Sequence, residues 1–418
     1  MPASARRIIR LALAVLVVGA AVGVMAALVT LFFRGVENLA FGYIESPAYP
    51  GAVDAPVWRR FSAVIAAGCV AAVVWWLIRT RARAVPSVKK AVDGGPMPWW
   101  ETLVHAALQV FFVGAGGPVG REVAPREIGA LLGQGVSRLT GLDPRERKLL
   151  VAAAAGAGLA GVYNVPLAGA LFTMEILLAE LSFEAAAVAL AVSGIAALIA
   201  SAVEGDRAFY LIYGAETSWS LGVFAVLFGP VFGLFGYWFS HWTAWAEKHK
   251  PQGARVLWLL PAASALTAVV SIWLPQVMGN GRALGQFALS ATAPSALTVL
   301  LLGMGVKSVL TLLTIRAGAS GGVLQPAIAL GAAAGAALGL GWAALWPGTP
   351  VVSFAIIAAA AVLGASQKAP FMALAIVFEL THAPIEFLAP LGIAVAGSAF
   401  TRVLLERRED RNPKKLDI

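Results

Sequence analysis

Charged residues and cysteine are scarce in this sequence. Asp, Glu, Lys and Arg make up 13% of the 418 residues, about half of the ~25% found in soluble domains. Hydrophobic residues make up 59%, and the mean hydropathy is +0.81. This composition excludes a typical soluble protein and predicts an all-α polytopic membrane protein. The single cysteine, Cys69, excludes an internal disulfide and any cysteine-based metal cluster.

The four histidines are scattered and lack the spacing of a metal-binding motif. We therefore expect no metal ion and no other cofactor. Residues 406–418 alone follow the last apolar run, far fewer than the ~50 residues of a small soluble domain. The expected organisation is one transmembrane domain over residues 1–418.

Long uncharged runs are few, and their lengths differ. The run Leu11 to Phe33 has 23 residues, and a helix needs about 20 to cross the hydrocarbon core. Segments of only about 10–14 apolar residues, such as 387–400, predict half-helices that end inside the bilayer, where broken backbone is tolerated if it is buried in protein or lines a wet cavity. The shorter runs are 61–78, 224–239, 256–274 and 387–400.

The formal net charge is +9, and the positions of the basic residues argue against nucleic acid as a partner. They gather before the first apolar run, after the second, and at the end of the chain. The positive-inside rule makes these segments and both termini cytoplasmic, as in a multi-pass protein of a bacterial-type inner membrane, and makes segment 34–56 external. The clusters are Arg6, Arg7 and Arg10; Arg79, Arg81, Arg83, Lys89 and Lys90; and Arg407, Arg408, Arg411, Lys414 and Lys415.

The chain contains one pair of motifs twice. Segment 120–125 (GREVAP) has its counterpart at 321–326 (GGVLQP), and segment 164–169 (NVPLAG) has its counterpart at 368–373 (KAPFMA). The offset is 201 residues between Pro125 and Pro326, and 204 residues between Pro166 and Pro370. In a chain this apolar, duplicated halves with segments broken by Gly and Pro indicate a transporter whose site lies at the repeat interface.

Glu122 is the strongest candidate for a functional residue. It lies in a glycine-rich break just before an expected helix start, and a carboxylate at membrane depth costs about 2.5–3.5 kcal/mol on insertion scales. The unpaired N–H groups of a helix N-terminus can bind this carboxylate or an anion, but not both at once. Protonation of Glu122 would therefore open the site to the anion. The alternative is a buried ion pair of Glu122 with Arg121 or Arg126.

A second helix N-terminus is expected at 318–326, directed at the same place from the other half. Its glycines let the backbone approach an ion closely, and Pro326 in the first turn sacrifices no needed donor. For the GxxxG pair Gly331 and Gly335 we favour close helix packing.

Three further charges lie in apolar surroundings. Glu175 and Glu379 each follow a motif proline by nine positions. We interpret them mainly as structural caps of polar backbone, with a direct proton role as the alternative. Lys307 lies inside an apolar run and either snorkels towards the interface or faces an anion pathway.

A protease is a remote alternative. Residues 318–321 (GASG) satisfy the GxSG pattern of rhomboid intramembrane serine proteases, with His382 as a conceivable base. This alternative leaves Glu122 and the duplication unexplained, and short motifs often match by chance. We therefore do not expect an enzyme.

Taken together, these motifs resemble the CLC family of chloride channels and anion/proton antiporters, over roughly residues 10–405. GRE at 120–122 matches the start of the family's GREGP motif, and GVLQP at 322–326 resembles its GxFxP motif. The resemblance implies two inverted-topology repeats with broken and re-entrant helices, at about 61–203 and 256–405. It also implies a homodimer, with segments 183–202 and 384–403 as the expected interface elements.

The resemblance assigns roles to single residues. Glu122 becomes the gating and proton-carrying glutamate. Arg83 falls at the Ser of the family's GSGIP motif, because 82–86 (ARAVP) is the best match; the other match, 94–98, leaves too little chain before Glu122 for a membrane crossing. The anion-binding residues implied are Gly120, Arg121, Val123, Val323, Leu324, Arg83 and, at the position of a central tyrosine, Phe400.

Departures from the family patterns bear on the substrate. GREVAP and the GASGG at 318–322 resemble the fluoride-exporting branch more than the chloride branch. Ile176 stands where chloride antiporters have an internal proton-transfer Glu, an acid that fluoride-type members also lack while still exchanging protons. We therefore predict exchange of a halide, fluoride or chloride, for protons. A passive chloride channel is the alternative.

Overall fold

The computed structural model describes residues 3–411, so Lys414 and Lys415 of the C-terminal basic cluster lie outside the described residues. The regular secondary structure of the described residues is helical, apart from an isolated backbone bridge between Gly120 and Gly322. Eight helices are long and apolar enough to cross a membrane. The prediction of an all-α polytopic membrane protein is confirmed.

The described residues form sixteen α-helices in two series, each with the same order of long and short elements. The first series is α1 (Ala3–Phe41), α2 (Val57–Arg81), α3 (Val88–Val92), α4 (Trp99–Gly114), α5 (Val123–Thr140), α6 (Pro144–Tyr163), α7 (Pro166–Phe172) with a π-helical extension (Thr173–Leu178), and α8 (Phe183–Glu204). The second is α9 (Trp219–Lys248), α10 (Val256–Val270), α11 (Arg282–Leu289), α12 (Leu297–Arg316), α13 (Leu324–Leu345), α14 (Val351–Gln367), α15 (Pro370–Thr381) and α16 (Leu388–Arg411). Short 3₁₀ turns (Gly253–Arg255, Pro275–Val277, Pro294–Ala296 and Ile385–Phe387) precede α10, α11, α12 and α16.

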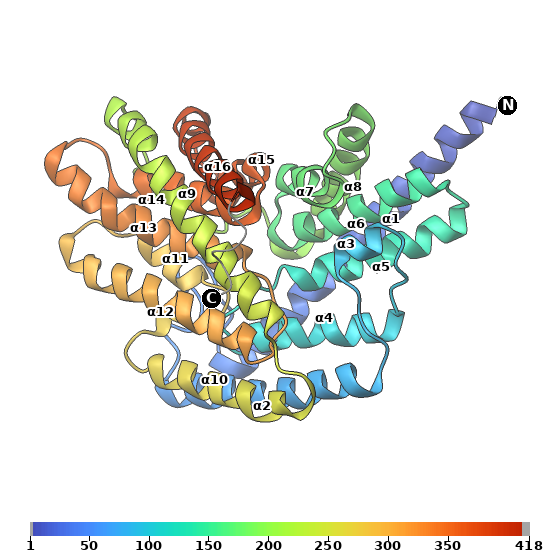
Figure 1. The fold of residues 1–418 in the computed structure, drawn as a ribbon, viewed down its shortest axis with the longest axis horizontal. Coiled ribbons are helices and arrows are strands. Elements are labelled where there is room, and N and C mark those ends of the chain that lie inside the picture. Colours follow the sequence, from blue (N-terminus) through green and yellow to red (C-terminus); the bar gives the residue numbers. More distant parts are fainter. Residues whose placement is uncertain (1–2, 412–418) are drawn as a thin grey trace.

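Helix packing follows the same plan in both series. The first helix of each series lies against the sixth and the eighth, so that α1 contacts α6 and α8 while α9 contacts α14 and α16. In Figure 1 the first series lies mainly on the right and the second mainly on the left. They meet where α7 contacts α15 and where α2 contacts α10.

Glycine allows the central helix pair of each series to pack closely. A Cβ atom at Gly331 or Gly335 would overlap α14, and one at Gly129 or Gly133 of α5 would overlap α6. The packing role expected for the GxxxG pair in α13 is confirmed, and α5 carries an equivalent pair.

Among residues 3–411, four residues other than glycine adopt positive φ angles, and they occupy matching places in the two series. Asn164 (φ 52°) and Lys368 (φ 58°) end the helices before α7 and α15. Ala179 (φ 52°) and His382 (φ 48°) follow those short helices. Proline then starts α7 and α15, where its missing N–H costs nothing.

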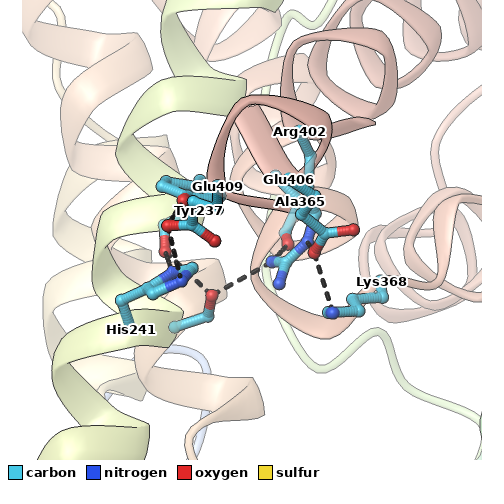
Figure 2. A network of polar contacts seen from close by, with 8 residues as sticks. Tyr237, His241, Ala365, Lys368, Arg402, Glu406 and Glu409 are labelled. Carbon is cyan, nitrogen blue, oxygen red and sulfur yellow. Dashed lines mark hydrogen bonds and ion pairs between the residues drawn. The ribbon is translucent and has the colours of Figure 1, made fainter. Parts of the chain in front are cut away.

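The expectation of a half-helix at 387–400 is wrong, because α16 continues to Arg411. Charged side chains in its last turns form ion pairs and hydrogen bonds, both within α16 and with neighbouring segments (Figure 2). Glu406 accepts from Arg402 Nε at 2.9 Å and from Lys368 Nζ at 2.7 Å. Glu409 accepts a hydrogen bond from the Tyr237 hydroxyl of α9. The runs 61–78 and 224–239 lie within helices long enough to cross a membrane, α2 and α9.

The short helices α7 and α15 cap each other across the two series. Glu175 follows α7 and accepts the backbone N–H groups of Phe371 (3.1 Å) and Met372 (2.6 Å) at the start of α15. Glu379 of α15 accepts those of Leu167 (2.9 Å) and Ala168 (2.8 Å) at the start of α7. The interpretation of both glutamates as structural caps is confirmed.

These caps should contribute measurably to stability. We expect Glu379→Ala to lower the free energy of unfolding by about 1.5–3 kcal/mol, because two N–H groups lose a charged acceptor. Glu379→Gln should cost less, since its carbonyl oxygen can still accept. Thermal unfolding of the purified protein measures the difference. Exposed Glu386 offers the control Glu386→Ala, and an equal loss in that variant would contradict the capping role.

Candidate functional site

The two glycine-rich breaks are joined by their backbones. Gly120 N–H donates to the Gly322 carbonyl and Gly322 N–H donates to the Gly120 carbonyl, both at 2.7 Å. Helix α5 begins three residues after Gly120 and α13 begins two residues after Gly322. The bridge therefore holds the N-termini of α5 and α13 side by side, one from each series, as the duplicated motifs predict.

The Glu122 side chain lies between these two helix starts and is fully buried. Its Oε1 accepts the backbone N–H of Leu324, in the first turn of α13, at 2.6 Å. Arg126 donates from Nε to the backbone carbonyl of Glu122, also at 2.6 Å, rather than to the carboxylate. The Arg121 guanidinium lies over the Phe33 ring, 3.8 Å from its centroid. The N–H group of Leu324, at a helix N-terminus, is thus a direct hydrogen-bond partner of the carboxylate.

Glycine is required around this carboxylate for steric reasons. A Cβ atom added at Gly120 or Gly322 would overlap the Glu122 carboxylate. The bare backbone therefore forms a small compartment that the carboxylate fills, and a compact anion could take its place.

Lys307 is a buried basic residue near the site. Its side chain is fully buried in α12, and its Nζ donates to the backbone carbonyls of Val277 and Gly279. It does not snorkel to a surface. The Glu122 carboxylate interacts electrostatically with this buried side chain.

The predicted site residues divide into two groups. Gly120, Arg121, Val123, Val323 and Leu324 belong to the two joined breaks and lie around Glu122. Arg83 and Phe400 do not belong to the group around Glu122.

Arg83 is positioned by a different partner. It lies in the segment between α2 and α3, its side chain is 71% exposed, and it donates to both oxygens of Glu101 (2.8 and 3.2 Å). This hydrogen-bonded carboxylate raises the pKa of Arg83. Phe400 is 63% exposed on α16, and the helix continues past it to Arg411.

Two aromatic residues near the site were not singled out from the sequence. The Tyr163 ring lies 5.3 Å from the Arg121 guanidinium, and the Tyr210 hydroxyl donates to Gln325 Oε1 at 3.1 Å. Tyr163 directly precedes the Asn-Val-Pro motif, which could have indicated it. Tyr210 lies between α8 and α9, and no motif marks it.

The residues of the protease alternative do not form a catalytic pair. The Ser320 hydroxyl accepts from Arg79 at 3.2 Å, and His382 is exposed at the end of α15. Within residues 3–411, no group of three or more His, Cys, Asp or Glu side chains could hold a metal ion.

The fit of glycine around Glu122 can be tested directly. We expect Gly322→Ala to displace the Glu122 carboxylate from Leu324, because the new methyl group would occupy its position. A structure of the variant by electron cryomicroscopy shows where the carboxylate lies. Gly341→Ala, in α13 with open space around it, is the matched control. An unmoved carboxylate in Gly322→Ala would contradict this description of the site.

Comparison with known proteins adds an independent line of evidence. Residues 63–402 match the family described as voltage gated chloride channel. An H+/Cl− exchange transporter (ClcA) of Vibrio parahaemolyticus is 28% identical over 414 residues, covering 94% of this chain and 87% of the transporter.

Solved structures share the fold. A slow cyanobacterial Cl−/H+ antiporter superposes with a TM-score of 0.81 at 20% identity, covering 97% of this chain and 99% of that one. A CLC-type fluoride/proton antiporter superposes with a TM-score of 0.71 at 20% identity, covering 93% of this chain and 94% of that one. Since the family match spans most of the sequence, the chain belongs to the voltage gated chloride channel (CLC) family.

Proposed function

We propose that this protein exchanges a halide anion for protons, with Glu122 as the group that links the two movements. The observation that supports this is the hydrogen bond from Leu324 N–H to the Glu122 carboxylate at a helix N-terminus. A negatively charged carboxylate and an anion compete for such N–H groups. Membership of a transporter family also excludes the protease alternative, and the protein is not an enzyme.

The exchange follows from this competition. When Glu122 takes up a proton it loses its negative charge, and its attraction to the N-termini of α5 and α13 weakens. The anion then binds the N–H groups of Val123, Val323 and Leu324. When Glu122 loses its proton, the carboxylate returns and expels the anion. One proton and the anion therefore use the same place in turn.

Chloride is the first candidate for the anion, because the Vibrio relative is an H+/Cl− exchange transporter. Fluoride is the second, supported by the GREVAP and GASGG segments and by the similarity to a fluoride/proton antiporter. A passive chloride channel is the alternative, because Ile176 cannot carry a proton.

We further propose a homodimer with both termini in the cytoplasm. Exposed apolar side chains lie on α8 and α16, among them Phe183 (92% exposed), Leu198 and Phe400. In the proposed dimer, α8 and α16 of one copy would pack against α8 and α16 of the second copy. The orientation rests on the basic clusters at 6–10, 79–90 and 407–411.

Glu122→Gln tests the proposed exchange. Glutamine has almost the same shape but no charge to gain or lose, so proton movement should cease while passive anion flux continues. Parallel chloride, fluoride and pH electrodes on reconstituted liposomes record both movements and identify the anion. Proton transport that persists in Glu122→Gln would remove Glu122 from the mechanism. Wild-type anion flux without proton movement would favour the channel.

Arg83 should have little influence on transport. The structure pairs it with Glu101 in an exposed position, so we expect Arg83→Gln to leave anion flux unchanged at low and at high salt. Liposome flux at several ionic strengths measures this. Slower flux at low salt alone would instead indicate that Arg83 attracts anions electrostatically.

A further inference from the structure

A titratable pair is buried where α4 contacts α5. It consists of His105 on α4 and Glu127 on α5, and His105 Nδ1 lies 2.9 Å from Glu127 Oε2. The amide of Gln109, also on α4, donates to the same oxygen at 2.9 Å. Glu127 is 5% exposed and Gln109 0%, while the His105 side chain is 14% exposed. We refer to His105 and Glu127 as the His–Glu pair.

The His–Glu pair lies between Glu122 and the face proposed as cytoplasmic. Glu127 follows Glu122 by five positions, and a rise of ~1.5 Å per residue places it about 7.5 Å further along α5. Helix α5 continues to Thr140, and the loop after it contains Asp143. Asp143 forms an ion pair with Arg7 of the N-terminal basic cluster at 3.1 Å. The direction from Glu122 to Glu127 is therefore the direction towards that cluster.

Helix α4 carries polar side chains from its first turn to the His–Glu pair. Glu101, His105 and Gln109 follow one another at intervals of four residues, and residues four apart lie on the same face of a helix. Glu101 accepts from Arg83, whose side chain is 71% exposed. A row of polar groups thus leads from the surface of the protein to the buried pair.

Arg126 connects the His–Glu pair with Glu122 electrostatically. It interacts with the carboxylates of both Glu122 and Glu127, and it donates to the Glu122 carbonyl at 2.6 Å. A proton that moves from one glutamate to the other therefore moves negative charge between two places near one guanidinium group. Other charged or titratable groups near Arg126 and the pair are Glu101 of α4, Tyr163 of α6, Arg79 of α2 and Lys250 after α9.

Two polar atoms beside the pair have no hydrogen-bond partner among the described residues. They are Oε1 of Gln109 and Nε1 of Trp75, whose ring lies 6.4 Å from the His105 ring. Buried polar atoms of this kind are commonly satisfied by ordered water. Water bound to them would extend the hydrogen bonds of the pair into a chain along which a proton can move.

A histidine and a carboxylate at this distance can take up one proton as a unit. With a neutral imidazole and an ionised carboxylate, the pair carries one negative charge. After the pair takes up a proton, it carries no net charge. Apolar surroundings penalise net charge, so the protein interior can accommodate the protonated pair. Gln109 can donate to the carboxylate in both states.

We propose that the His–Glu pair carries protons between Glu122 and the cytoplasm. In one direction of transport, the carboxylic acid of Glu122 loses a proton and the pair gains it through intervening water. The pair then releases a proton towards the start of α4, so each group returns to its starting charge and no proton is lost or created. This rests on the proposed function, because it supplies the route of the proton that is exchanged at Glu122.

The pair also joins α4 to α5, and a purely structural contact would respond differently to substitution. Glutamine at position 127 keeps the length and an accepting oxygen but cannot take up a proton. Aspartate keeps the carboxylate but shortens the side chain. A structural contact would therefore tolerate Glu127→Gln better than Glu127→Asp, whereas a proton carrier would tolerate Glu127→Asp better.

Reconstituted liposomes with parallel pH, chloride and fluoride electrodes measure the proton and anion fluxes of these variants. In Glu127→Gln we expect the proton flux to fall about a hundredfold, the lower end of what a positioned proton-transferring group contributes. Anion flux should continue, because Glu122 can still exchange protons with the external side. Glu127→Asp should retain more proton flux than Glu127→Gln, and His105→Gln should lose proton flux as Glu127→Gln does.

The proposal is overturned if Glu127→Gln moves protons at the wild-type rate or faster than Glu127→Asp. Equal loss of proton and anion flux in Glu127→Gln and His105→Gln would also overturn it, since that result indicates a structural contact. His105→Gln and Glu127→Asp decide the question if Glu127→Gln fails to fold.

Glu146→Gln is the matched control. Glu146 is 4% exposed, accepts from Arg7 Nε at 2.6 Å and from the Asp143 N–H at 3.0 Å, and belongs to the capping box of α6. Glutamine can serve in the same capping box, so both fluxes should remain as in the wild type. A comparable loss of proton flux in Glu146→Gln would count against the proposal, because any buried carboxylate would then have the same effect.

The two proposals can fail separately. If Glu122→Gln loses proton transport while Glu127→Gln and His105→Gln keep it, the role of the His–Glu pair alone is overturned. If Glu127→Gln loses proton transport while Glu122→Gln keeps it, the role of Glu122 is overturned and the pair remains a proton carrier. If the wild type moves no protons, both proposals are overturned.

Discussion

The helices that begin inside this protein start in apolar surroundings, so their first N–H groups need an acceptor other than water. At three places that acceptor is a carboxylate from the opposite series of helices. Glu122 reaches α13, Glu175 reaches α15 and Glu379 reaches α7. The two series are therefore joined by hydrogen bonds at the helix starts whose N–H groups have no acceptor within their own series.

The three carboxylates differ in how firmly they are held. Glu175 and Glu379 each accept two backbone N–H groups, one on each oxygen. Glu122 accepts one, and its Oε2 is buried without a hydrogen-bond partner. An unsatisfied buried oxygen weakens the hold on a carboxylate. All three glutamates thus make the same kind of contact with a helix N-terminus, but Glu122 has fewer hydrogen-bond donors than the two caps. Because it is held less firmly, Glu122 is suited to leave the N-terminus when an anion takes its place.

The duplicated motifs were enough to predict that helices begin at the Gly and Pro breaks, that two helix N-termini meet, and that Glu175 and Glu379 are caps. Gly and Pro interrupt a helix through their own backbone conformation, so their effect can be predicted from the local sequence. Arg83 and Phe400 could not be placed in the same way. Arg83 is positioned by Glu101, 18 residues later, and Phe400 by the continuation of α16, which depends on pairing with α9 and α14. The charged residues Glu37, Glu45, Arg121 and Arg282 come from α1, the loop after it, the segment before α5 and α11, and no spacing pattern in the sequence indicates that they meet.

The positive-φ residues show that the two series share backbone geometry without sharing residue types. Asn164 and Lys368 adopt one backbone conformation, as do Ala179 and His382. The glutamate of each series caps the short helix of the other. Neither half of the chain could satisfy these N–H groups alone, so each half depends on the other for a complete set of hydrogen bonds.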